Sequence, residues 1–554
     1  MSTSIQNKRT DLLLINGIAG LFFISLNGGV RLFDWDEINF AECAREMIVM
    51  NDYLRAHIDL LPFWEKPPLV FWLQALAMKI FGINEFSARF PNAICGMLTL
   101  SSIYLFGSHI WNRKFAWLWV GSWFGAVLPH LYFKSGIIDP WFNLFMFLSI
   151  MGLIMASWSN PKKDSPFANR PYRYLFLGGI ALGLAMLTKG PTGLLVVGLT
   201  AFTVLIVNRF QWYLHFGQFL FFGLVALATA AIWFGVETYL HGPWFVTTFI
   251  TYNYRLFSTG DAGHSGFPGY HFVVLLVGCF PASIFAIRGM GLGKRGNAYQ
   301  ADFHRWMLVL FWVVLILFSV VGTKIVHYSS MCYFPLTFLS AITINQLWEK
   351  RIEFSTWMRG LIVGIGALFA LVVIALPFLA MQKTFLRQLL EKDPFAVANL
   401  EAEIHWTGWE ILPGIVLIAV LVLFFYYYKK QNNQKAFSIL SFGIGVFVLS
   451  TLIAFIGRIE GFSQAAAMEF YESKQNERCY ILTKDFRTFG TYFYGKVMPP
   501  RDTASYNENW LLTGPVDRPT YIVTKITGED QVKDLPTVRK LYSKNGFVFF
   551  ERVR

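Results

Sequence analysis

Residues 361–381 read LIVGIGALFALVVIALPFLAM, a run without one charged side chain. A helix of about 20 apolar residues is long enough to cross the hydrocarbon core of a bilayer. Similar runs recur along the 554-residue chain, which is 55% hydrophobic and 15% charged, against about 25% charged in a typical soluble domain. This composition excludes soluble, disordered and fibrous proteins, and the unbroken apolar runs exclude an outer-membrane barrel. The sequence therefore predicts an all-α polytopic membrane protein.

The apolar runs predict about thirteen transmembrane helices. No cleavage site follows the first run, so we interpret it as an uncleaved anchor with a cytoplasmic N-terminus. Segment 68–82 is short for a span and carries Lys79, so we interpret it as a re-entrant or interfacial helix; if it crossed the membrane, every later loop would change sides. The predicted spans are 12–27, 87–110, 115–133, 140–157, 174–188, 191–208, 218–240, 271–288, 306–322, 328–347, 358–381, 410–428 and 437–456.

The net charge of +13 comes from short basic clusters between the apolar runs and does not indicate nucleic-acid binding. Loops assigned to the cytoplasm hold these clusters, whereas the short outer loops 134–139 and 323–327 hold one Lys each. This asymmetry predicts that the first long loop, 30–86, lies outside the cytoplasm. The five cysteines suggest neither a disulfide framework nor a metal site.

The composition changes after Ile456. Residues 457–554 hold 15 Lys+Arg and 12 Asp+Glu, about 28% of that segment, whereas about 12% of residues 1–456 are charged. We therefore predict a transmembrane domain over 1–456 and a small soluble α/β domain over 457–554, on the extracytoplasmic side because the span count is odd. Its expected strands are Cys479–Thr483, Thr520–Thr524 and Gly546–Phe550, with a helical stretch between the last two.

Loop 30–86 is rich in carboxylates and aromatic residues, and reads DWDEINFAECARE at 34–46. Carboxylates beside Trp35 and Trp64 suit a sugar site, where rings stack on the sugar and acids bind its hydroxyls. Asp36 has two interpretations. It is either a catalytic carboxylate or the N-cap of a helix over about 37–50, on which Glu42 and Arg45 would form a solvated pair.

Two further motifs lie on the same side of the membrane. In Glu65-Lys66-Pro67-Pro68 the prolines start the interfacial helix, which places Lys66 where it could bind a lipid-linked phosphate or simply reach the membrane surface. Asp139 opens a span at its outer end, either as a functional carboxylate or as an N-cap before Pro140.

More polar residues gather on this side, and each alone is more often structural. Lys189, in a tight Gly-Pro turn, is expected to mark a hairpin between two spans. Together, outward cations and carboxylates describe a site for an anionic substrate and a proton acceptor. The set comprises Lys189, Arg255, His264, His271, Lys324, His327 and Tyr328.

At these motifs the chain resembles the polyprenyl-phosphate-dependent GT-C glycosyltransferases, a group that includes the bacterial lipid A aminoarabinose transferase and the protein O-mannosyltransferases. The similar pieces lie in family order over residues 10–345. They are D-E-x-x-F-A-E-x-x-R-E-M (36–47), F-W-E-K-P-P (63–68), F-G-x-N-E-F-x-A-R-F-P (81–91), the Asp139 motif, L-T-K-G-P (187–191), the loop 253–270 and K-x-x-H-Y (324–328).

The resemblance implies an enzyme of the bacterial inner membrane with its active site facing the periplasm. It would move a sugar from a polyprenyl-phosphate donor to an envelope acceptor (lipid, glycan or protein), with inversion. Asp36 and Asp139 would be the catalytic carboxylates. Lys66, Arg255, Tyr328, Lys324 and Glu37 would bind the donor and its phosphate, while Glu65 and His264 would lie at the family's possible divalent-metal position.

One departure from the family concerns an arginine. The aminoarabinose transferases carry Arg-Tyr where this chain has Asn39-Phe40. Either Arg31, Arg45 or Arg255 replaces that arginine, or the donor differs.

Two other function classes stay open, a lipid-linked oligosaccharide polymerase or ligase and a membrane transporter. A transporter would place ionisable residues near the bilayer midplane. Here they gather at the outer surface, which favours an enzyme.

Overall fold

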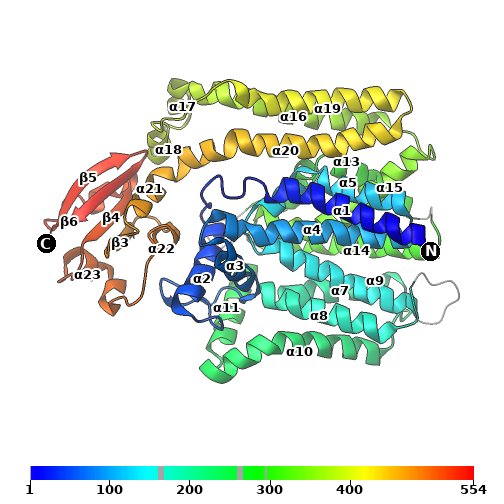
Figure 1. Ribbon diagram of the computed structural model, residues 1–554, viewed down its shortest axis with the longest axis horizontal. Coiled ribbons are helices and arrows are strands. Elements are labelled where there is room, and N and C mark those ends of the chain that lie inside the picture. Colours follow the sequence, from blue (N-terminus) through cyan, green and yellow to red (C-terminus); the bar gives the residue numbers. More distant parts are fainter. Residues whose placement is uncertain (1, 160–166, 259–265, 294–295, 554) are drawn as a thin grey trace.

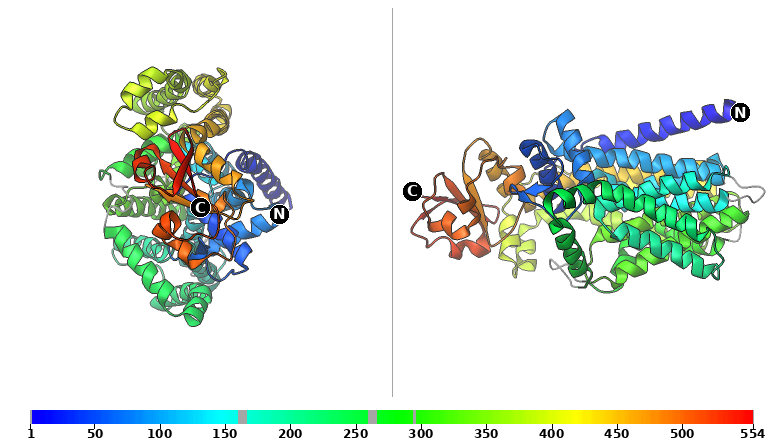
Figure 2. Two further views of the ribbon diagram at one scale, coloured as in Figure 1. Left: turned by 90° about the vertical axis from the view of Figure 1, so that its left-hand side faces the viewer. Right: turned by 90° about the horizontal axis from the view of Figure 1, so that it is seen from below.

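The computed structural model describes residues 2–159, 167–258, 266–293 and 296–553. Long helices run side by side in a bundle, with the N-terminus at one end and a small β-sheet beyond the other (Figures 1 and 2). The chain is a mostly helical, multi-span membrane protein with a small C-terminal mixed-sheet domain.

Seven helices in the described part of the chain are long and apolar enough to cross a membrane, or eight spans if one bent pair is counted. In lipid, a helix satisfies all its backbone polar groups internally, so these apolar runs fold as helices. The seven are α4 (Glu85–Ile110), α7 (Asp139–Ser159), α10 (Phe216–His241), α14 (Ala298–Val320), α16 (Thr356–Met381), η5 with α19 (Trp409–Lys429) and α20 (Asn433–Ser463).

The other predicted spans are helical but shorter, broken or less apolar than these seven. In the bent pair, Tyr270–Gly278 (α12) and Ala282–Leu292 (α13 and η3) meet at 113°. The prediction of a helical multi-span membrane protein is confirmed. In the described part of the chain, however, seven or eight spans, rather than thirteen, are long and apolar enough to cross a membrane. The remaining bundle helices are α1 (Ser2–Ile24), α5 (Arg113–Phe124), α6 (Val127–Leu131), η1 (Tyr132–Lys134), α8 (Pro171–Lys189), α9 (Thr192–Val207), η4 (Val326–Cys332) and α15 (Tyr333–Trp348).

Short elements cover the end of the bundle nearest the sheet. The apolar run at 68–82 forms α3 (Leu69–Phe81), a helix too short to span, beside α2 (Asp36–Met50) (Figure 1). The first loop also holds a two-stranded ribbon, β1 (His57–Ile58) with β2 (Leu61–Pro62). Further along the chain are α11 (Trp244–Ser258), α17 (Lys383–Leu389) and α18 (Pro394–Asn399).

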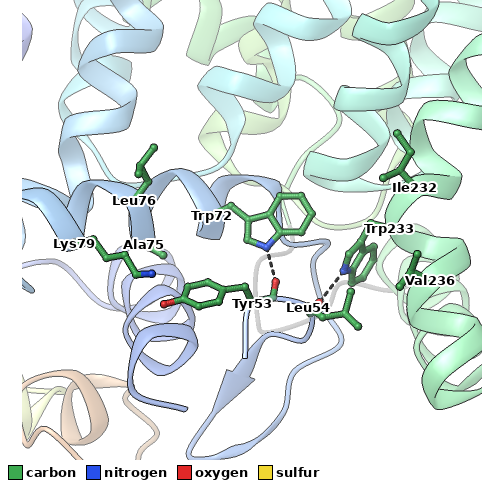
Figure 3. Close-up of a pocket in the computed structure, with 9 residues that line it drawn as sticks. All are labelled: Tyr53, Leu54, Trp72, Ala75, Leu76, Lys79, Ile232, Trp233 and Val236. Atoms are coloured by element: carbon green, nitrogen blue, oxygen red, sulfur yellow. Dashed lines mark hydrogen bonds between the residues drawn. The ribbon is translucent and has the colours of Figure 1, made fainter. Parts of the chain in front are cut away.

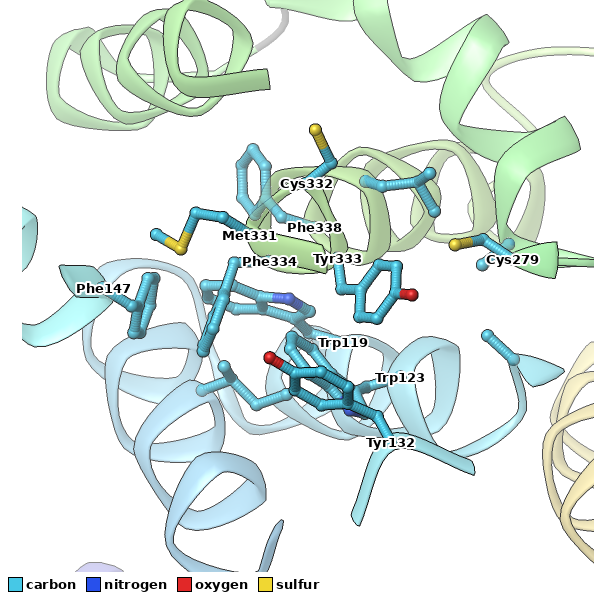
Figure 4. Close-up of a cluster of buried hydrophobic side chains, with 14 of the residues drawn as sticks. Trp119, Trp123, Tyr132, Phe147, Cys279, Met331, Cys332, Tyr333, Phe334 and Phe338 are labelled. Atoms are coloured by element: carbon cyan, nitrogen blue, oxygen red, sulfur yellow. The ribbon is translucent and has the colours of Figure 1, made fainter. Parts of the chain in front are cut away.

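An aromatic core joins α5, α7 and α15. Trp119 and Trp123 are fully buried, and Trp123 lies 4.6 Å from Phe334, ring centroid to ring centroid (Figure 4). Phe147 stacks on Phe334 at 4.2 Å. Such pairs add about 0.5–1.5 kcal/mol each beyond area burial, so this core is a rigid support for the helix ends.

The C-terminal sheet has the order β3-β4-β6-β5, with β3 and β4 parallel and the other pairs antiparallel. Three predicted strands are present, but the stretch expected to be helical holds a short 3₁₀ turn and a fourth strand, β5. The elements are α21 (Ala465–Ser473), β3 (Tyr480–Lys484), α22 (Gly490–Phe493), η6 (Thr503–Tyr506), α23 (Glu508–Thr513), β4 (Thr520–Lys525), η7 (Ile526–Gln531), β5 (Val538–Lys544) and β6 (Phe547–Arg552).

Ion pairs fasten the first loop to the C-terminal part of the chain. Arg31 pairs with Glu460 at the end of α20 and with Glu472 in α21. The Arg45–Glu42 pair of α2, solvated under the capping interpretation of Asp36, is instead buried, and Arg45 also donates to the carbonyl of Val497 at 2.8 Å. The C-terminal residues therefore form part of the cover of α2.

Candidate functional site

Asp36 is the first residue of α2, and its side chain does not cap the helix. The N-cap position is Trp35, and no side-chain hydrogen bond closes this end. The alternative interpretation of Asp36 as a capping residue therefore finds no support in the geometry. The carboxylate is partly exposed, as a group that meets a substrate must be.

The neighbouring Glu37 fixes this end of α2 in place. It pairs with Arg89 of α4 at 2.8 Å and accepts hydrogen bonds from the backbone N–H groups of Phe33 and Gly136. Burial raises the pKa of Glu37, but the Arg89 guanidinium outweighs it and holds that pKa below its usual value. Because Gly136 lies three residues before Asp139, Glu37 connects the backbones that carry the two candidate carboxylates.

Asp139 begins α7 and forms an ion pair with Lys189, the last residue of α8, at 2.6 Å. The helices approach closely because a Cβ on Gly152 would meet the Cα of Gly178 at 2.7 Å. The chain leaves α8 through Gly190, whose φ of +76° favours glycine. The turn predicted from Lys-Gly-Pro is present, and it delivers Lys189 to the site.

His327 lies between the two carboxylates. Its Nε2 is 3.7 Å from Oδ2 of Asp36 and 3.7 Å from Oδ2 of Asp139. These distances are too long for direct hydrogen bonds but close enough for electrostatic attraction. Burial lowers the pKa of His327, an effect that both carboxylates oppose, so the imidazole is neutral near pH 7.

Lys66 also belongs to this cluster. Burial, aided by the nearby charge of Lys189, holds the pKa of its ammonium group below the usual value, although Glu65, Asp36 and Asp139 oppose this shift. Its Nζ lies 5.0 Å from the ring centroid of Tyr252, whose hydroxyl donates to Glu65 at 3.3 Å. Lys189 Nζ, in turn, lies 5.0 Å from the ring centroid of Tyr328. The cluster thus offers a carboxylate to take a proton and cations to hold an anionic group.

Other predicted residues are placed differently. Lys324 donates to the carbonyls of Phe318, Ser319 and Val321 and so caps the end of α14. That geometry gives it a structural role, and its proposed contact with the donor stays a prediction. Arg255 is exposed near the end of α11, with its guanidinium 5.5 Å from the Tyr252 ring.

The structure distinguishes the three arginines that could replace the one missing from the family pattern, while a different donor stays the alternative. Arg31 is engaged with two glutamates, and Arg45 is buried against Glu42. Arg255, beside the ring that also contacts Lys66, is therefore the candidate that the geometry favours.

Three residues of the cluster had weak sequence signals. Tyr252 was not singled out, because one tyrosine in an aromatic-rich chain carries no distinguishing pattern. His327 and Lys189 were predicted only as members of the polar set that describes the site, and neither was given a role of its own. Only the fold shows that they meet residues far away in the chain.

The predicted metal position rests on Glu65 and His264. His264 lies outside the described residues, and within the described ranges no group of three His, Cys, Asp or Glu side chains could hold a metal ion. Glu65 lies beside a lysine and a tyrosine, and neither side chain is a usual ligand of a divalent cation. These residues do not fit a metal site by themselves, so metal binding stays a prediction.

An apolar groove of about 510 Å³ lies between α3 and α10 (Figure 3). Its floor is the backbone of Tyr53 and Leu54, held by the indole N–H groups of Trp72 and Trp233. Leu76, Ile232, Val236 and Lys79 contribute to the walls. Trp64, two residues before Lys66, packs in one cluster with Leu54, Trp72 and Trp233, so the groove lies near the Lys66 loop.

Comparison with known proteins gives three findings. Residues 65–234 match the family described as dolichyl-phosphate-mannose-protein mannosyltransferase. Two undecaprenyl phosphate-alpha-4-amino-4-deoxy-L-arabinose arabinosyl transferases are similar to the chain. The one from Pectobacterium carotovorum is 26% identical over 67% of this chain and 65% of the relative. The one from Shewanella sediminis is 27% identical over 65% and 64%.

The crystal structure of ArnT from Cupriavidus metallidurans bound to undecaprenyl phosphate has the same fold. It superposes with a TM-score of 0.78 at 16% sequence identity, covering 98% of both chains. The sequence matches span slightly less than two thirds of those two curated relatives. The predicted resemblance to polyprenyl-phosphate-dependent GT-C glycosyltransferases is confirmed.

Proposed function

We propose that this protein is an inverting glycosyltransferase that moves a sugar from a polyprenyl-phosphate donor to an envelope acceptor. One observation carries the proposal. Asp36 and Asp139 converge with Lys66 and Lys189 at one end of the helix bundle, beside an apolar groove. The resemblance of sequence and fold supports the same enzyme class.

The reaction needs one base and a cationic clamp. Asp36 takes the proton from the acceptor hydroxyl. The acceptor oxygen then attacks the anomeric carbon of the donor sugar, on the face opposite to the bond between that carbon and the phosphate oxygen. That bond breaks, and its electron pair leaves with the lipid phosphate, whose charge Lys66 and Arg255 neutralise. A positioned base of this kind contributes roughly 10²–10⁴-fold. Asp139, already paired with Lys189, positions the acceptor.

The donor is lipid-borne in this proposal. Its phosphate binds at Lys66, and the first part of its isoprenoid chain lies in the groove between α3 and α10 (Figure 3). The groove is lined mainly by apolar side chains, and Leu76, Ile232 and Val236 in its walls are exposed. In the sequence we find no Gly-rich βαβ unit that would bind a nucleotide sugar.

The first donor to test is 4-amino-4-deoxy-L-arabinose on undecaprenyl phosphate, because the curated relatives are named for it. A lipid such as lipid A, a glycan or a protein is the acceptor. A divalent metal bound with Glu65 and His264 is a further part of the proposal, and no step above depends on it.

We also propose thirteen passes through a bacterial inner membrane, with the site and residues 457–554 in the periplasm. The positions of the basic loops and of the C-terminal sheet along the bundle support this orientation. The basic loops lie at the end of the bundle that holds the N-terminus, and the sheet lies at the other end (Figure 1).

The test is a transfer assay with purified protein in detergent. A polyprenyl-monophosphate sugar should be a donor, and the matching nucleotide sugar should not. Lys66→Ala should weaken donor use more than Lys66→Arg, because the contact is chiefly charge on phosphate.

Lys435→Ala, at the other end of the bundle, is the matched control and should leave transfer unchanged. Transfer from the nucleotide sugar in a lipid-free assay would refute the proposed donor. Equal activity of the two Lys66 variants would remove Lys66 from the site.

A further inference from the structure

A second cavity lies in the C-terminal domain, away from the carboxylate cluster. It has a volume of about 130 Å³ and lies between the start of β3 and the segment 491–501. Liquid water occupies about 30 Å³ per molecule, so the cavity holds a phosphate-sized group with some water but not a whole sugar. Its lining includes four cationic side chains, those of Arg478, Lys496, Arg501 and Arg518.

The carboxylates nearby compensate only part of this charge. Glu477, which also lines the cavity, accepts from Lys474 at 3.1 Å and from the hydroxyl of Tyr521 at 2.8 Å. Arg518 pairs with Asp517, and Arg501 pairs with Asp59. Two cations remain, because no ion pair or hydrogen bond of the Arg478 or Lys496 side chain is found within the described part of the chain.

The cavity is tied directly to the loop that carries the catalytic candidates. Val497 in its wall accepts a hydrogen bond from Arg45 of α2, and Asp59 of the first loop pairs with Arg501. The hydroxyl of Tyr506 also donates to the carbonyl of Asp59 at 2.8 Å. Asp36 and Arg45 lie nine residues apart on one helix, which corresponds to about 14 Å. A ligand could therefore reach from the cavity toward Asp36 if it were one or two sugar residues long.

We propose that this cavity binds a phosphate group on the glycan part of the acceptor. Guanidinium groups bind phosphate through paired, charge-assisted hydrogen bonds, which give both attraction and orientation. A phosphate held here would orient the acceptor so that a hydroxyl on a neighbouring sugar faces Asp36. The inference rests on the proposed transferase function, since it assigns the anchor of that reaction's acceptor.

The test measures binding first, independently of catalysis. The full-length protein in detergent is titrated with a hexosamine phosphate and with inorganic phosphate by calorimetry. The double variant Arg478→Ala/Lys496→Ala should weaken hexosamine phosphate binding by about tenfold or more. Arg539→Ala, which removes an exposed cation of β5, should leave the affinity unchanged.

Three outcomes would overturn the inference. They are unchanged affinity in the double variant, equal loss in Arg539→Ala, and binding of inorganic phosphate as tightly as the sugar phosphate. Equally tight binding of inorganic phosphate would mean that the cavity binds any phosphate ion and does not recognise the sugar of the acceptor.

A transfer assay then separates this inference from the proposed function. With a phosphorylated acceptor, the double variant should raise KM for the acceptor about tenfold at little change in kcat. If Asp36→Asn loses transfer but still binds the sugar phosphate, the loss supports the catalytic role of Asp36. The intact binding supports a phosphate site in the cavity that is independent of catalysis. If purified protein transfers no sugar at all, the proposed function fails, while the binding result still decides whether the cavity is a phosphate site.

Discussion

The Nζ of Lys189 lies 2.6 Å from Oδ1 of Asp139, so one of the two candidate carboxylates is already neutralised by a lysine. Asp36 has no such lysine partner among the described contacts and is more exposed. A carboxylate freed from a direct ion pair accepts a proton more readily than one held by an ammonium group. In the proposed reaction we therefore give the two residues different tasks, with Asp36 as the base and Asp139 as the positioning group.

The first prediction follows from this division. Asp36→Asn should lower transfer by roughly 10²–10⁴-fold, because the amide cannot take the proton. Asp139→Asn should cause a smaller loss, and Lys189→Met should resemble it. The measurement is kcat with purified protein, and expression in the membrane should stay unchanged.

The matched control is Asp393→Asn, a capping residue of α18 where Asn serves as well as Asp. Near-normal transfer by Asp36→Asn would remove that residue from catalysis, and equal losses at the two sites would contradict the assigned division of roles.

The second prediction concerns Glu37, which holds Arg89 and the backbone before Asp139. Glu37→Gln leaves a buried guanidinium without its counter-charge, so we expect a loss of about 3 kcal/mol or more. Thermal unfolding in detergent is the measurement. Glu349→Gln, which breaks a partly exposed pair with Lys114 at the opposite end, should cost less than about 1 kcal/mol. Equal shifts in melting temperature would show that Glu37 has no special structural role.

The third prediction is a pH dependence of stability at the contact between the first loop and the C-terminal domain. Burial raises the pKa of Asp34 to about 6, although the Thr488 hydroxyl and the backbone N–H of Phe489 oppose the shift. Because the folded-state pKa lies above the unfolded value, the stabilising contribution is complete below about pH 4 and is lost as the pH rises through 6.

Melting curves from pH 4 to 7.5 would test this dependence. The wild type should lose stability relative to Asp34→Asn across that interval, by about 1–3 kcal/mol. Other groups titrate in both proteins and cancel in the difference. A flat difference curve would show that Asp34 has an ordinary pKa.

The fourth prediction concerns topology. Because α20 continues to Ser463, past the predicted end of the last span, a reporter is better fused to the intact C-terminus than after residue 456. A periplasm-dependent reporter should be active there, and one inserted after Gln431 should be inactive. The reverse pattern would place the site in the cytoplasm and refute the assignment of the donor face.

The sequence predicted the helical bundle well because apolar runs determine it directly. It missed strand β5, since Val538–Lys544 is a largely exposed edge strand with no apolar pattern. Under the capping interpretation of Asp36, Glu42 and Arg45 were expected to be solvated, because the sequence does not show that Val497, some 450 residues later, covers them. Asp36 and Lys66 were predicted from one loop, whereas the pairing of Asp139 with Lys189 required knowing how α7 meets α8.

The bonds from Arg31 to Glu460 and Glu472 span more than 400 residues of sequence. They bear on how the protein is made. The ribosome delivers Arg31 and the rest of the first loop early, but Glu460 and Glu472 emerge only when most of the chain has been translated, so the loop lacks these ion pairs until then. Closing contacts of such high sequence separation is slow. A product truncated before residue 460 would lack both carboxylate partners of Arg31 and the Val497 carbonyl that accepts from the buried Arg45.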